Sequence, residues 1–274
     1  MEDKYIYSTS DISQFYDLTP KGLAYYEEQG IIHPKRKEDS SYRIFTLEDC
    51  YSLYHSKLYK NSGLTLKEMV NIEKNGSLDE IVETLNHSAE NELKRIKIET
   101  RIQERVLEIT QELANYQKYG QSFEVVMREE FYRLFVRTFD FHHVTDKKSS
   151  NEFAKWNKYI PISTASLLYT KEKLLSHDQA MNVNIANIIS AKDLEFLGLE
   201  KTSHVTCYAP CKCIKTIIHG NANDIDSKLW LEESLWYINQ KGYVLDGDVL
   251  TSMLLVTGEK DQKTRYDIAW FPIK

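Results

Sequence analysis

The sequence lacks the features of a membrane or secreted protein. No run of about 18 apolar residues, the length that a spanning helix needs, occurs among its 274 residues. The charged N-terminal residues 1–4 are not followed by the apolar segment of a secretory signal. Cysteine is also scarce, with too few residues for a disulfide scaffold: Cys50, Cys207, Cys211 and Cys213. We therefore expect a cytoplasmic protein with reduced thiols and no membrane partner.

Positive charge is in short supply. The net charge is −6, and residues 1–75 carry 10 lysines and arginines against 12 aspartates and glutamates. A protein that grips nucleic acid over a broad basic surface would carry the opposite balance. Any such contact would therefore depend on local clusters such as Lys35–Lys37, although a short basic run is more often just a charged turn.

Signatures of catalysis are missing as well. The sequence has no nucleophile elbow, no phosphate-binding loop and no HExxH metal motif. The adjacent histidines His142 and His143 fall in a polar turn without a plausible partner. We therefore expect neither an enzyme nor a bound cofactor or metal ion.

Short helices with N-terminal caps are predicted along residues 5–75. Each would follow a side chain that can accept a hydrogen bond from the first turn: Ser8, Thr19, Thr46 and Thr65. Gly30 and the nearby Pro34 would end the second helix. The polar segment Ile31–Phe45, with a charged tip at Lys35–Asp39, is typical of a two-stranded hairpin.

Aromatic and basic residues mark this first part of the chain. Tyr25 and Tyr26 lie near the end of the second predicted helix, and Arg43 follows Tyr42 on the hairpin. A helix that enters the major groove of DNA, next to a wing that holds phosphate, needs side chains of these types in this arrangement. The tyrosines would otherwise be helix-packing aromatics, and Arg43 an ordinary solvated arginine.

A long helix is predicted after the cap at Ser77, because no glycine or proline occurs between Leu78 and Tyr119. It would span about 40 residues and about 60 Å. Its apolar residues recur at spacings of three and four, with a phase slip near Glu99: Leu78, Val82, Leu85, Ala89, Leu93, Ile96, Ile102, Val106, Ile109, Leu113 and Tyr116. This apolar seam needs a partner, either a second copy in a homodimeric coiled coil or the chain's own C-terminal domain.

The last part of the chain, residues 121–274, mixes strand and helix patterns. Phe123–Phe139 alternates as one strand, and helices are predicted at Asn151–Tyr159 and Asp224–Lys241. Further strands are predicted at Thr164–Tyr169, Asn182–Ile189, His204–Tyr208, Cys213–Ile218, Val249–Val256 and Tyr266–Ile273. This order indicates an α+β domain with an internal duplication.

Four stretches of the first 75 residues form a collinear set of motifs: Tyr7–Ile12, Leu18–Glu27, Ser41–Phe45 and Gly63–Met69. Together they resemble the DNA-binding domain of the MerR family of transcriptional regulators. The long helix is similar to the family's antiparallel dimerisation helix, and residues 123–274 resemble the gyrase-inhibitor-like effector-binding domain of its multidrug-sensing branch. The resemblance implies a multidomain fold of three parts: a winged helix-turn-helix head (1–76), a dimerisation helix in an antiparallel coiled coil (77–120) and a duplicated α+β effector domain (121–274).

The resemblance also implies a way of working. A homodimer would bind a pseudo-palindromic site in double-stranded promoter DNA and distort it, so that RNA polymerase engages both promoter elements. The residues that it assigns to DNA contact are Thr19, Lys21, Tyr25, Tyr26, Tyr42, Arg43 and Lys60. The chain departs from the family pattern at Ala24, where an arginine is usual, and at Ser41, where a glycine is usual. The first change removes a phosphate contact and so lowers the expected affinity for DNA.

A small lipophilic, aromatic effector is expected to bind the C-terminal domain. Aromatic faces would line its cleft, and a carboxylate would balance a cationic ligand. The candidate residues are Tyr132, Tyr159, Tyr169, Tyr208, Trp230, Trp236, Thr251, Asp267 and Trp270. Thr251 stands where the family has its acidic pocket residue, so the counter-charge would come from Asp267, Asp246 or Asp248, or the ligand would be neutral. Aromatic residues in such patterns are more often part of a core.

Two other interpretations of this domain stay open. Cys207, Cys211 and Cys213 could form a metal or thiol sensor, although their spacing matches no standard zinc pattern. Buried structural thiols are the plainer explanation of the same residues. The domain could also bind a protein partner in place of a small molecule.

Overall fold

The chain divides into two compact units, and the division falls inside the long helix. The computed structural model describes residues 5–37, 40–138, 147–176, 181, 183–259 and 262–274. The units are Met1–Lys97 and Ile98–Lys274, while the domain boundaries predicted at residues 76 and 120 stay predictions. Among the described residues, no helix is both long enough and apolar enough to cross a membrane.

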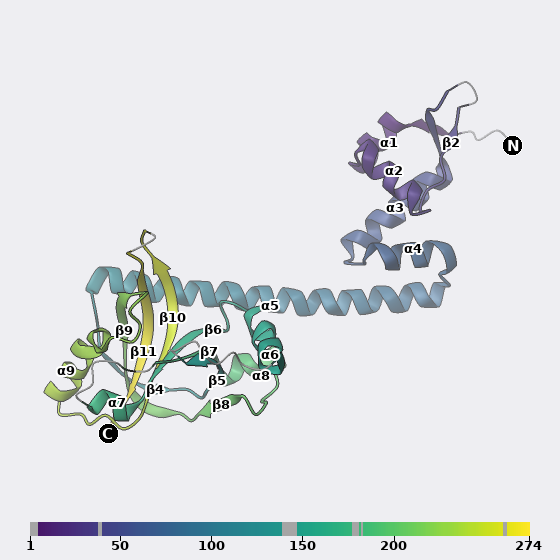
Figure 1. The fold of residues 1–274 in the computed structure, drawn as a ribbon. Coiled ribbons are helices and arrows are strands. Elements are labelled where there is room, and N and C mark those ends of the chain that lie inside the picture. Colours follow the sequence, from purple (N-terminus) through teal and green to yellow (C-terminus); the bar gives the residue numbers. More distant parts are fainter. Residues whose placement is uncertain (1–4, 38–39, 139–146, 177–180, 182, 260–261) are drawn as a thin grey trace. The chain divides into compact units, whose positions relative to one another are not determined.

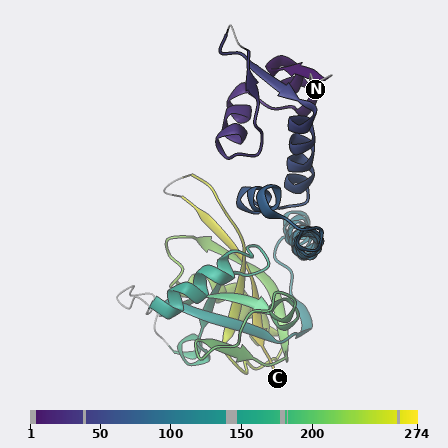
Figure 2. The same cartoon turned by 90° about the vertical axis from the view of Figure 1, so that its right-hand side faces the viewer.

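The N-terminal unit packs short helices around a small sheet (Figure 1, Figure 2). In chain order its described elements are β1 (Ile6–Ser8), α1 (Thr9–Tyr16), α2 (Pro20–Glu28), β2 (Lys35–Arg36), β3 (Arg43–Thr46), α3 (Leu47–Asn61) and α4 (Leu66–Asn75). Strand β3 lies between β1 and β2, and both pairs are antiparallel. The predicted hairpin is therefore confirmed, and Glu38 and Asp39 of its predicted tip lie outside the described residues.

Local hydrogen bonds start these helices where the sequence predicts. The hydroxyls of Ser8, Thr19, Thr46 and Thr65 each accept a bond from a backbone N–H in the following turn. The helices are then held by a shared core, whose fully buried members include Ile12, Leu23, Ile31, Ile32, Phe45 and Leu53. Helices this short are marginal in isolation, so the common core is what stabilises them.

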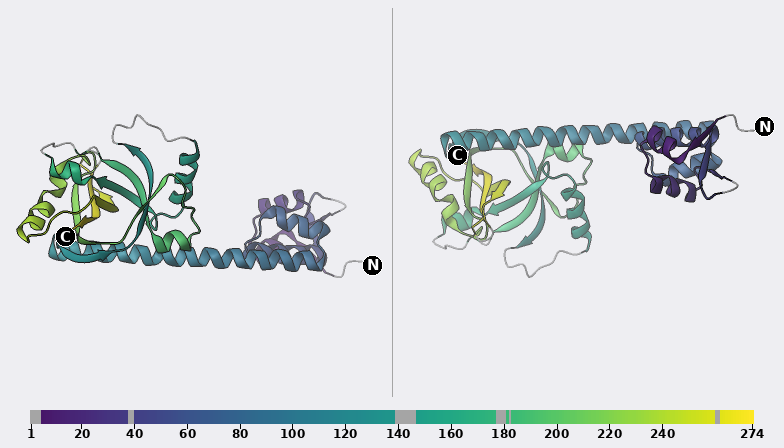
Figure 3. Two further views of the ribbon diagram at one scale, coloured as in Figure 1. Left: turned by 90° about the horizontal axis from the view of Figure 1, so that it is seen from below. Right: turned by 90° about the horizontal axis from the view of Figure 1, so that it is seen from above.

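Helix α5 (Leu78–Tyr119) confirms the predicted long helix. Beyond the phase slip near Glu99, the side chains of Ile109, Leu113 and Tyr116 pack on the sheet of the C-terminal unit. Figure 3 shows this half of α5 lying along that sheet. The chain's own C-terminal domain is therefore the partner of this part of the seam.

The apolar residues of α5 that precede the phase slip are mostly exposed. Leu85 packs against residues of α3 and α4, but Leu78, Val82, Leu93 and Ile96 are exposed. At about 100° per residue, the exposed Leu107 continues the same face of α5. The phase slip thus separates two apolar faces of one helix, of which one is covered by the chain and the other is not. The coiled coil that would cover the second face stays a prediction.

The C-terminal unit is built on a large antiparallel sheet, whose order among the described residues is β4-β9-β11-β10-β6-β7-β5-β8. The strands are β4 (Glu124–Arg128), β5 (Phe131–Thr138), β6 (Thr164–Tyr169), β7 (Asn184–Ser190), β8 (Val205–Tyr208), β9 (Cys211–Asn221), β10 (Val249–Thr257) and β11 (Thr264–Pro272). The helices are α6 (Lys147–Asn157), α7 (Lys171–Leu175), α8 (Ala191–Phe196), the 3-10 helix η1 (Lys228–Leu231) and α9 (Glu232–Gln240). The predicted duplication stays a prediction.

Two predicted elements of this unit are wrong in their extent. The single strand predicted at Phe123–Phe139 is divided into β4 and β5, which lie far apart in the sheet order. Alternation continues through the break at Glu129–Glu130, because β4 and β5 keep one register against β9 and β8 and no glycine or proline marks the interruption. Phe139 itself lies outside the described residues.

The helix predicted at Asp224–Lys241 starts later, at η1. Residues 224–227 are held in turns instead, because the Asp226 carboxylate accepts a hydrogen bond from the backbone N–H of Val183 at 3.1 Å. The side chain of Ile225 joins the core at the same place. Tertiary contacts of Ile225 and Asp226 thus keep the first residues of this segment out of the helix, although their sequence pattern is helical.

The two faces of the sheet bury different sets of side chains. Tyr169, Ala269 and Phe271 pack with residues of η1 and α9. Ile268 and Trp270, which alternate with them along β11, pack with the C-terminal half of α5. Gly220 on β9 permits the closest approach on the first face, since a Cβ there would meet the indole Nε1 of Trp230 at 2.0 Å.

We expect Leu113→Ala to lower the free energy of unfolding of the C-terminal unit by about 2 kcal/mol, because it removes apolar contacts between α5 and the sheet. Leu175→Ala is the matched control, since Leu175 is exposed at the end of α7, and should change stability by about 0.5 kcal/mol or less. Urea unfolding followed by tryptophan fluorescence reports on this unit, which holds all four tryptophans. Equal effects of the two substitutions would show that α5 does not pack on the sheet.

Candidate functional site

The start of α2 presents several predicted contact residues to solvent. The Thr19 hydroxyl accepts a hydrogen bond from the backbone N–H of Gly22 at 3.1 Å, and Pro20 occupies the first helical position. Lys21 and Tyr25 are exposed on the helix that follows. The exposed N-terminus of a helix has unpaired N–H groups, which favour a negatively charged partner such as phosphate.

The two adjacent tyrosines of α2 have different surroundings. Tyr25 is exposed, whereas Tyr26 packs partly against the core of the unit, and this burial raises the pKa of its hydroxyl. Tyr26 and Lys60 line one small pocket of about 150 Å³. Lys60 is exposed and lies near the C-terminal end of α3. The structure thus brings Tyr26 close to Lys60, with part of its ring used for packing.

Glu27 joins α2 to the hairpin through two arginines. Its carboxylate accepts hydrogen bonds from Arg36 at 2.6 Å and from Arg43 Nε at 2.7 Å. These partly exposed ion pairs fix the hairpin against α2 more than they add stability. Tyr42, beside Arg43, is 76% exposed. A single carboxylate between two arginines leaves a local excess of positive charge in a unit that is acidic as a whole.

The nine residues predicted to bind an effector do not line one cleft. Tyr169 of β6 and Trp230 of η1 are buried in one core with residues of α9, and the Tyr169 hydroxyl donates to the carbonyl of Ile225 at 3.1 Å. Burial raises the pKa of Tyr169. Tyr132 and Tyr159 belong to a second cluster with Trp156.

The remaining aromatic candidates lie elsewhere. Tyr208 and Trp270 pack on the face of the sheet that α5 covers. Trp236 on α9 is 63% exposed. The predicted ligand-binding aromatic residues are thus spread over three buried clusters and one exposed position.

The candidate counter-charge Asp267 is already paired. Its carboxylate accepts two hydrogen bonds from Arg265, at 2.7 and 2.8 Å, and a third from the Thr251 hydroxyl at 2.5 Å. Thr251 in turn accepts a bond from the backbone N–H of Leu167 at 2.9 Å. Asp267 and Thr251 are fully buried. In this arrangement Asp267 neutralises an arginine of its own strand, which sits two residues away on the same face.

The three clustered cysteines do not share one environment. Cys207 is exposed on β8, while the sulfur atoms of Cys211 and Cys213 lie 3.5 Å apart on β9. Burial, with a hydrogen bond to Cys211, raises the pKa of the Cys213 thiol to about 12. Cys213 is therefore protonated at neutral pH, and thiolates are what metals and oxidants react with. Within the described ranges, no three cysteine, histidine or acidic side chains are placed to share a metal ion.

A cavity of about 320 Å³ lies between the C-terminal half of α5 and the face of the sheet that carries Trp270. Its wall combines charged side chains from the helix and the sheet with two aromatic rings: Arg101, Arg105, Arg128, Lys215, Phe131 and Trp270. The ring centroids of Phe131 and Trp270 are 5.0 Å apart. Of the nine predicted ligand-binding residues, only Trp270 is among those that line this cavity.

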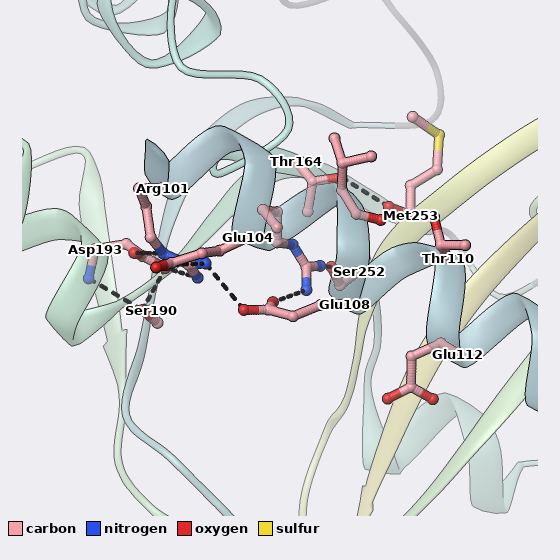
Figure 4. Close-up of polar contacts among 12 residues, drawn as sticks. Arg101, Glu104, Glu108, Thr110, Glu112, Thr164, Ser190, Asp193, Ser252 and Met253 are labelled. Atoms are coloured by element: carbon pink, nitrogen blue, oxygen red, sulfur yellow. Dashed lines mark hydrogen bonds and ion pairs between the residues drawn. The ribbon is translucent and has the colours of Figure 1, made fainter. Parts of the chain in front are cut away.

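Arg101, a residue of the cavity wall, joins α5 to Asp193 of α8 (Figure 4). Its guanidinium donates to both carboxylate oxygens of Asp193, at 2.6 and 3.0 Å, and to Glu108 at 2.9 Å. The hydrogen bond to Asp193 is the main cause of a raised pKa at Arg101. Asp193 is itself held by Ser190, whose hydroxyl donates to it at 2.9 Å.

Further charges of the cavity wall are paired along α5. Arg105 donates to Glu108 at 2.8 Å, and Lys215 from β9 forms an ion pair with Glu112. Burial raises the pKa of Glu108, but the hydrogen bonds from Arg105 and Arg101 outweigh it, so the net pKa is lowered. Glu108 is therefore ionised at neutral pH and holds two arginines at the cavity.

Comparison with known proteins bears on the N-terminal unit. Residues 7–75 match the family described as "MerR HTH family regulatory protein". They form a MerR-family helix-turn-helix domain. The match covers α1 to α4 and the hairpin, and so contains the predicted contact residues from Thr19 to Lys60. No curated protein matches the chain.

Solved structures resemble the chain weakly. EcmrR in complex with DNA is 15% identical with a TM-score of 0.36, covering 98% of this chain and 99% of its own. HiNmlR, a MerR family regulator lacking the sensor domain and bound to promoter DNA, is 19% identical with a TM-score of 0.34, over 42% and 92%. A hydrolase from Listeria innocua is 11% identical with a TM-score of 0.37, over 60% and 98%.

The charged wall of the cavity was not predicted from the sequence. Arg101, Arg105, Glu108 and Glu112 have the pattern of the solvated face of a long helix. The sequence signal for this wall was the phase slip near Glu99. Beyond it, the apolar residues lie on a different face of the helix, and these charged residues lie beside that face. For the MerR-type domain, in contrast, motifs in a fixed order sufficed to choose the candidate residues.

We expect Asp267→Asn to lower the free energy of unfolding of the C-terminal unit by about 3 kcal/mol, because it leaves the buried guanidinium of Arg265 without its counter-charge. Asp246→Asn is the control, since Asp246 pairs with the exposed Lys274. Urea unfolding monitored by tryptophan fluorescence compares the two variants. A loss no larger than that of the control would show that Asp267 is free to balance a cationic ligand.

Proposed function

We propose that the protein is a DNA-binding transcriptional regulator of the MerR type, and that the C-terminal unit makes it responsive to a small effector. The match of residues 7–75 carries this proposal. The described geometry supports it, because α2 exposes Thr19, Lys21 and Tyr25, and Glu27 fixes the hairpin with Arg43 beside this helix. Specific binding would come from α2 in the major groove and from phosphate contacts of the hairpin.

A homodimer through α5 is part of this proposal. The exposed apolar face of α5 runs from Leu78 through Leu93 to Leu107, a length of about 45 Å at 1.5 Å per residue. An exposed apolar stripe of this length on a helix is typical of an interface between chains. Two copies would place two MerR-type domains on the two halves of a pseudo-palindromic promoter site.

The proposed regulatory step uses α5 as the connection between the units. A bound effector would favour the active arrangement only by interacting more strongly with it than with the inactive one. The active dimer would bend and untwist promoter DNA and so let RNA polymerase engage both promoter elements. The effector in this proposal is a small, lipophilic, aromatic molecule.

Selection from a pool of random DNA duplexes should recover a pseudo-palindromic sequence that the full-length protein binds. For the selected duplex, Arg43→Ala should raise the dissociation constant about tenfold, because a phosphate contact is lost and the hairpin is released from Glu27. The salt dependence of binding should become shallower by about one unit of slope for that contact. Arg95→Ala, which removes an exposed arginine of α5, is the control. Failure to select any duplex would refute DNA binding.

Size-exclusion chromatography with light scattering should give twice the 32.1 kDa of the chain. Leu93→Asp should yield the single-chain mass, because it places a charge in the proposed apolar interface. Leu175→Asp puts the same charge at an exposed leucine outside α5 and should leave the mass unchanged. A dimer that survives Leu93→Asp would place the interface elsewhere.

A further inference from the structure

The cavity beneath α5 has the size of a small-molecule site. Its volume of about 320 Å³ lies in the range of pockets that hold small organic ligands. All residues of its wall belong to the C-terminal unit. It lies on the opposite face of the sheet from Thr251 and Asp267, whose neighbours along the strands, Ser252 and Ile268, line it.

One basic residue of the wall stands apart from the others. Arg101, Arg105 and Lys215 each pair with a carboxylate described above. Arg128 is 5% exposed, and its guanidinium donates a hydrogen bond to the backbone carbonyl of Ala209 at 2.8 Å. Within the part of the chain that the structure describes, its Nε has no hydrogen-bond partner. The remaining acidic residue of the wall, Glu129, is exposed on the next position of the chain.

The fold itself explains why Arg128 is so buried. It ends β4, in register with Cys211 at the start of β9. Only Ala209 and Pro210 separate β9 from β8, which lies at the opposite edge of the sheet order. Three Cα steps span at most about 11 Å, so the sheet must curl until these edges approach each other. Arg128 is enclosed at this junction and contacts the connection through Ala209.

A buried guanidinium without a counter-charge is costly, since charge is taken out of water without compensation. A carboxylate or a similar oxyanion is the group that compensates it best, through charge-assisted hydrogen bonds from the guanidinium. The rings of Phe131 and Trp270, with Ile268, supply an apolar surface in the same cavity. The wall therefore offers one unpaired cation and one aromatic surface.

We propose that this cavity is a binding site for a small aromatic acid, with the acidic group at Arg128 and the ring against Phe131 and Trp270. Its regulatory role rests on the function proposed above, and the site specifies that the effector is an anion. Four wall residues belong to α5, namely Arg101, Arg105, Glu108 and Glu112. An acid bound here would therefore contact the helix that connects the two units.

Binding to the full-length protein by isothermal titration calorimetry tests this site. The probes are matched pairs of an acid and its neutral amide: benzoate and benzamide, indole-3-acetate and indole-3-acetamide, and 1-naphthaleneacetate and 1-naphthaleneacetamide. We expect at least one acid to bind about tenfold or more tightly than its amide, because the amide cannot balance Arg128. The proposal is overturned if no acid is preferred over its amide.

Two variants test whether Arg128 is the source of the preference for the acid over its amide. In Arg128→Gln the acid should lose its advantage and bind within about twofold of its amide, since the counter-charge is gone. Arg95→Gln removes an arginine of α5 outside the cavity wall and should keep the full preference. An acid preference that persists in Arg128→Gln would move the site elsewhere and so refute the proposal.

A measurement on the unaltered protein guards against a variant that fails to fold. In protein labelled with nitrogen-15 at arginine, the acid should shift the Nε–H resonance that is missing from the spectrum of Arg128→Lys. A tightly bound acid that leaves this resonance unmoved would contradict the proposal. Inorganic phosphate is added as a competitor. If phosphate binds as tightly as the aromatic acid and displaces it, the cavity is a simple anion site, and the proposed role of the aromatic rings is overturned.

The outcome is separate from that of the DNA experiment. Protein that selects a duplex but shows no preference for acids keeps the proposed function and loses this site. Protein that binds an acid at Arg128 but selects no duplex keeps the site and loses the regulatory function.

Discussion

The structure depends on one helix with two apolar faces, of which one packs on the chain's own sheet and the other is exposed. The C-terminal half of α5 is held on the sheet by Ile109, Leu113 and Tyr116, and the clamp between Arg101 and Asp193 fixes its rotation. Once this face is turned inward, the stripe from Leu78 to Leu107 must point elsewhere, because the two are separated by the helical phase. The same constraint thus sets the wall of the cavity and the surface available to a second chain.

Charge is arranged differently in the two units. In the MerR-type domain, two arginines share Glu27 at the surface, so positive charge is concentrated beside α2 in a sequence that is acidic overall. Inside the C-terminal unit, the buried Arg265 is paired with Asp267, and the buried Arg133 donates hydrogen bonds to Ser166 and Asn184. Arg128 differs from both, because its Nε has no hydrogen-bond partner among the described residues, and the proposed acid would supply its counter-charge.

Much of the candidate site could be predicted where function depends on local motifs. The caps at Thr19 and Thr46, the hairpin and the aromatic pair of α2 are signalled by neighbouring residues, so the sequence identified them. The same reasoning could not separate Tyr25 from Tyr26, since burial depends on how α2 packs. The aromatic residues of the C-terminal unit do not by themselves point to one place, because a core and a cleft need the same side chains.

The sequence by itself determined the order of the elements, the long helix and the MerR-type domain, because capping, periodicity and turn chemistry act over a few residues. Only the tertiary structure decided how the sheet curls, which face of α5 is covered and which charges are paired. Asp267 and Arg265 are two residues apart, but their burial depends on strands distant in sequence. Arg128 became a candidate only when the junction of β4, β8 and β9 enclosed it, since a desolvated charge is a property of the packed chain.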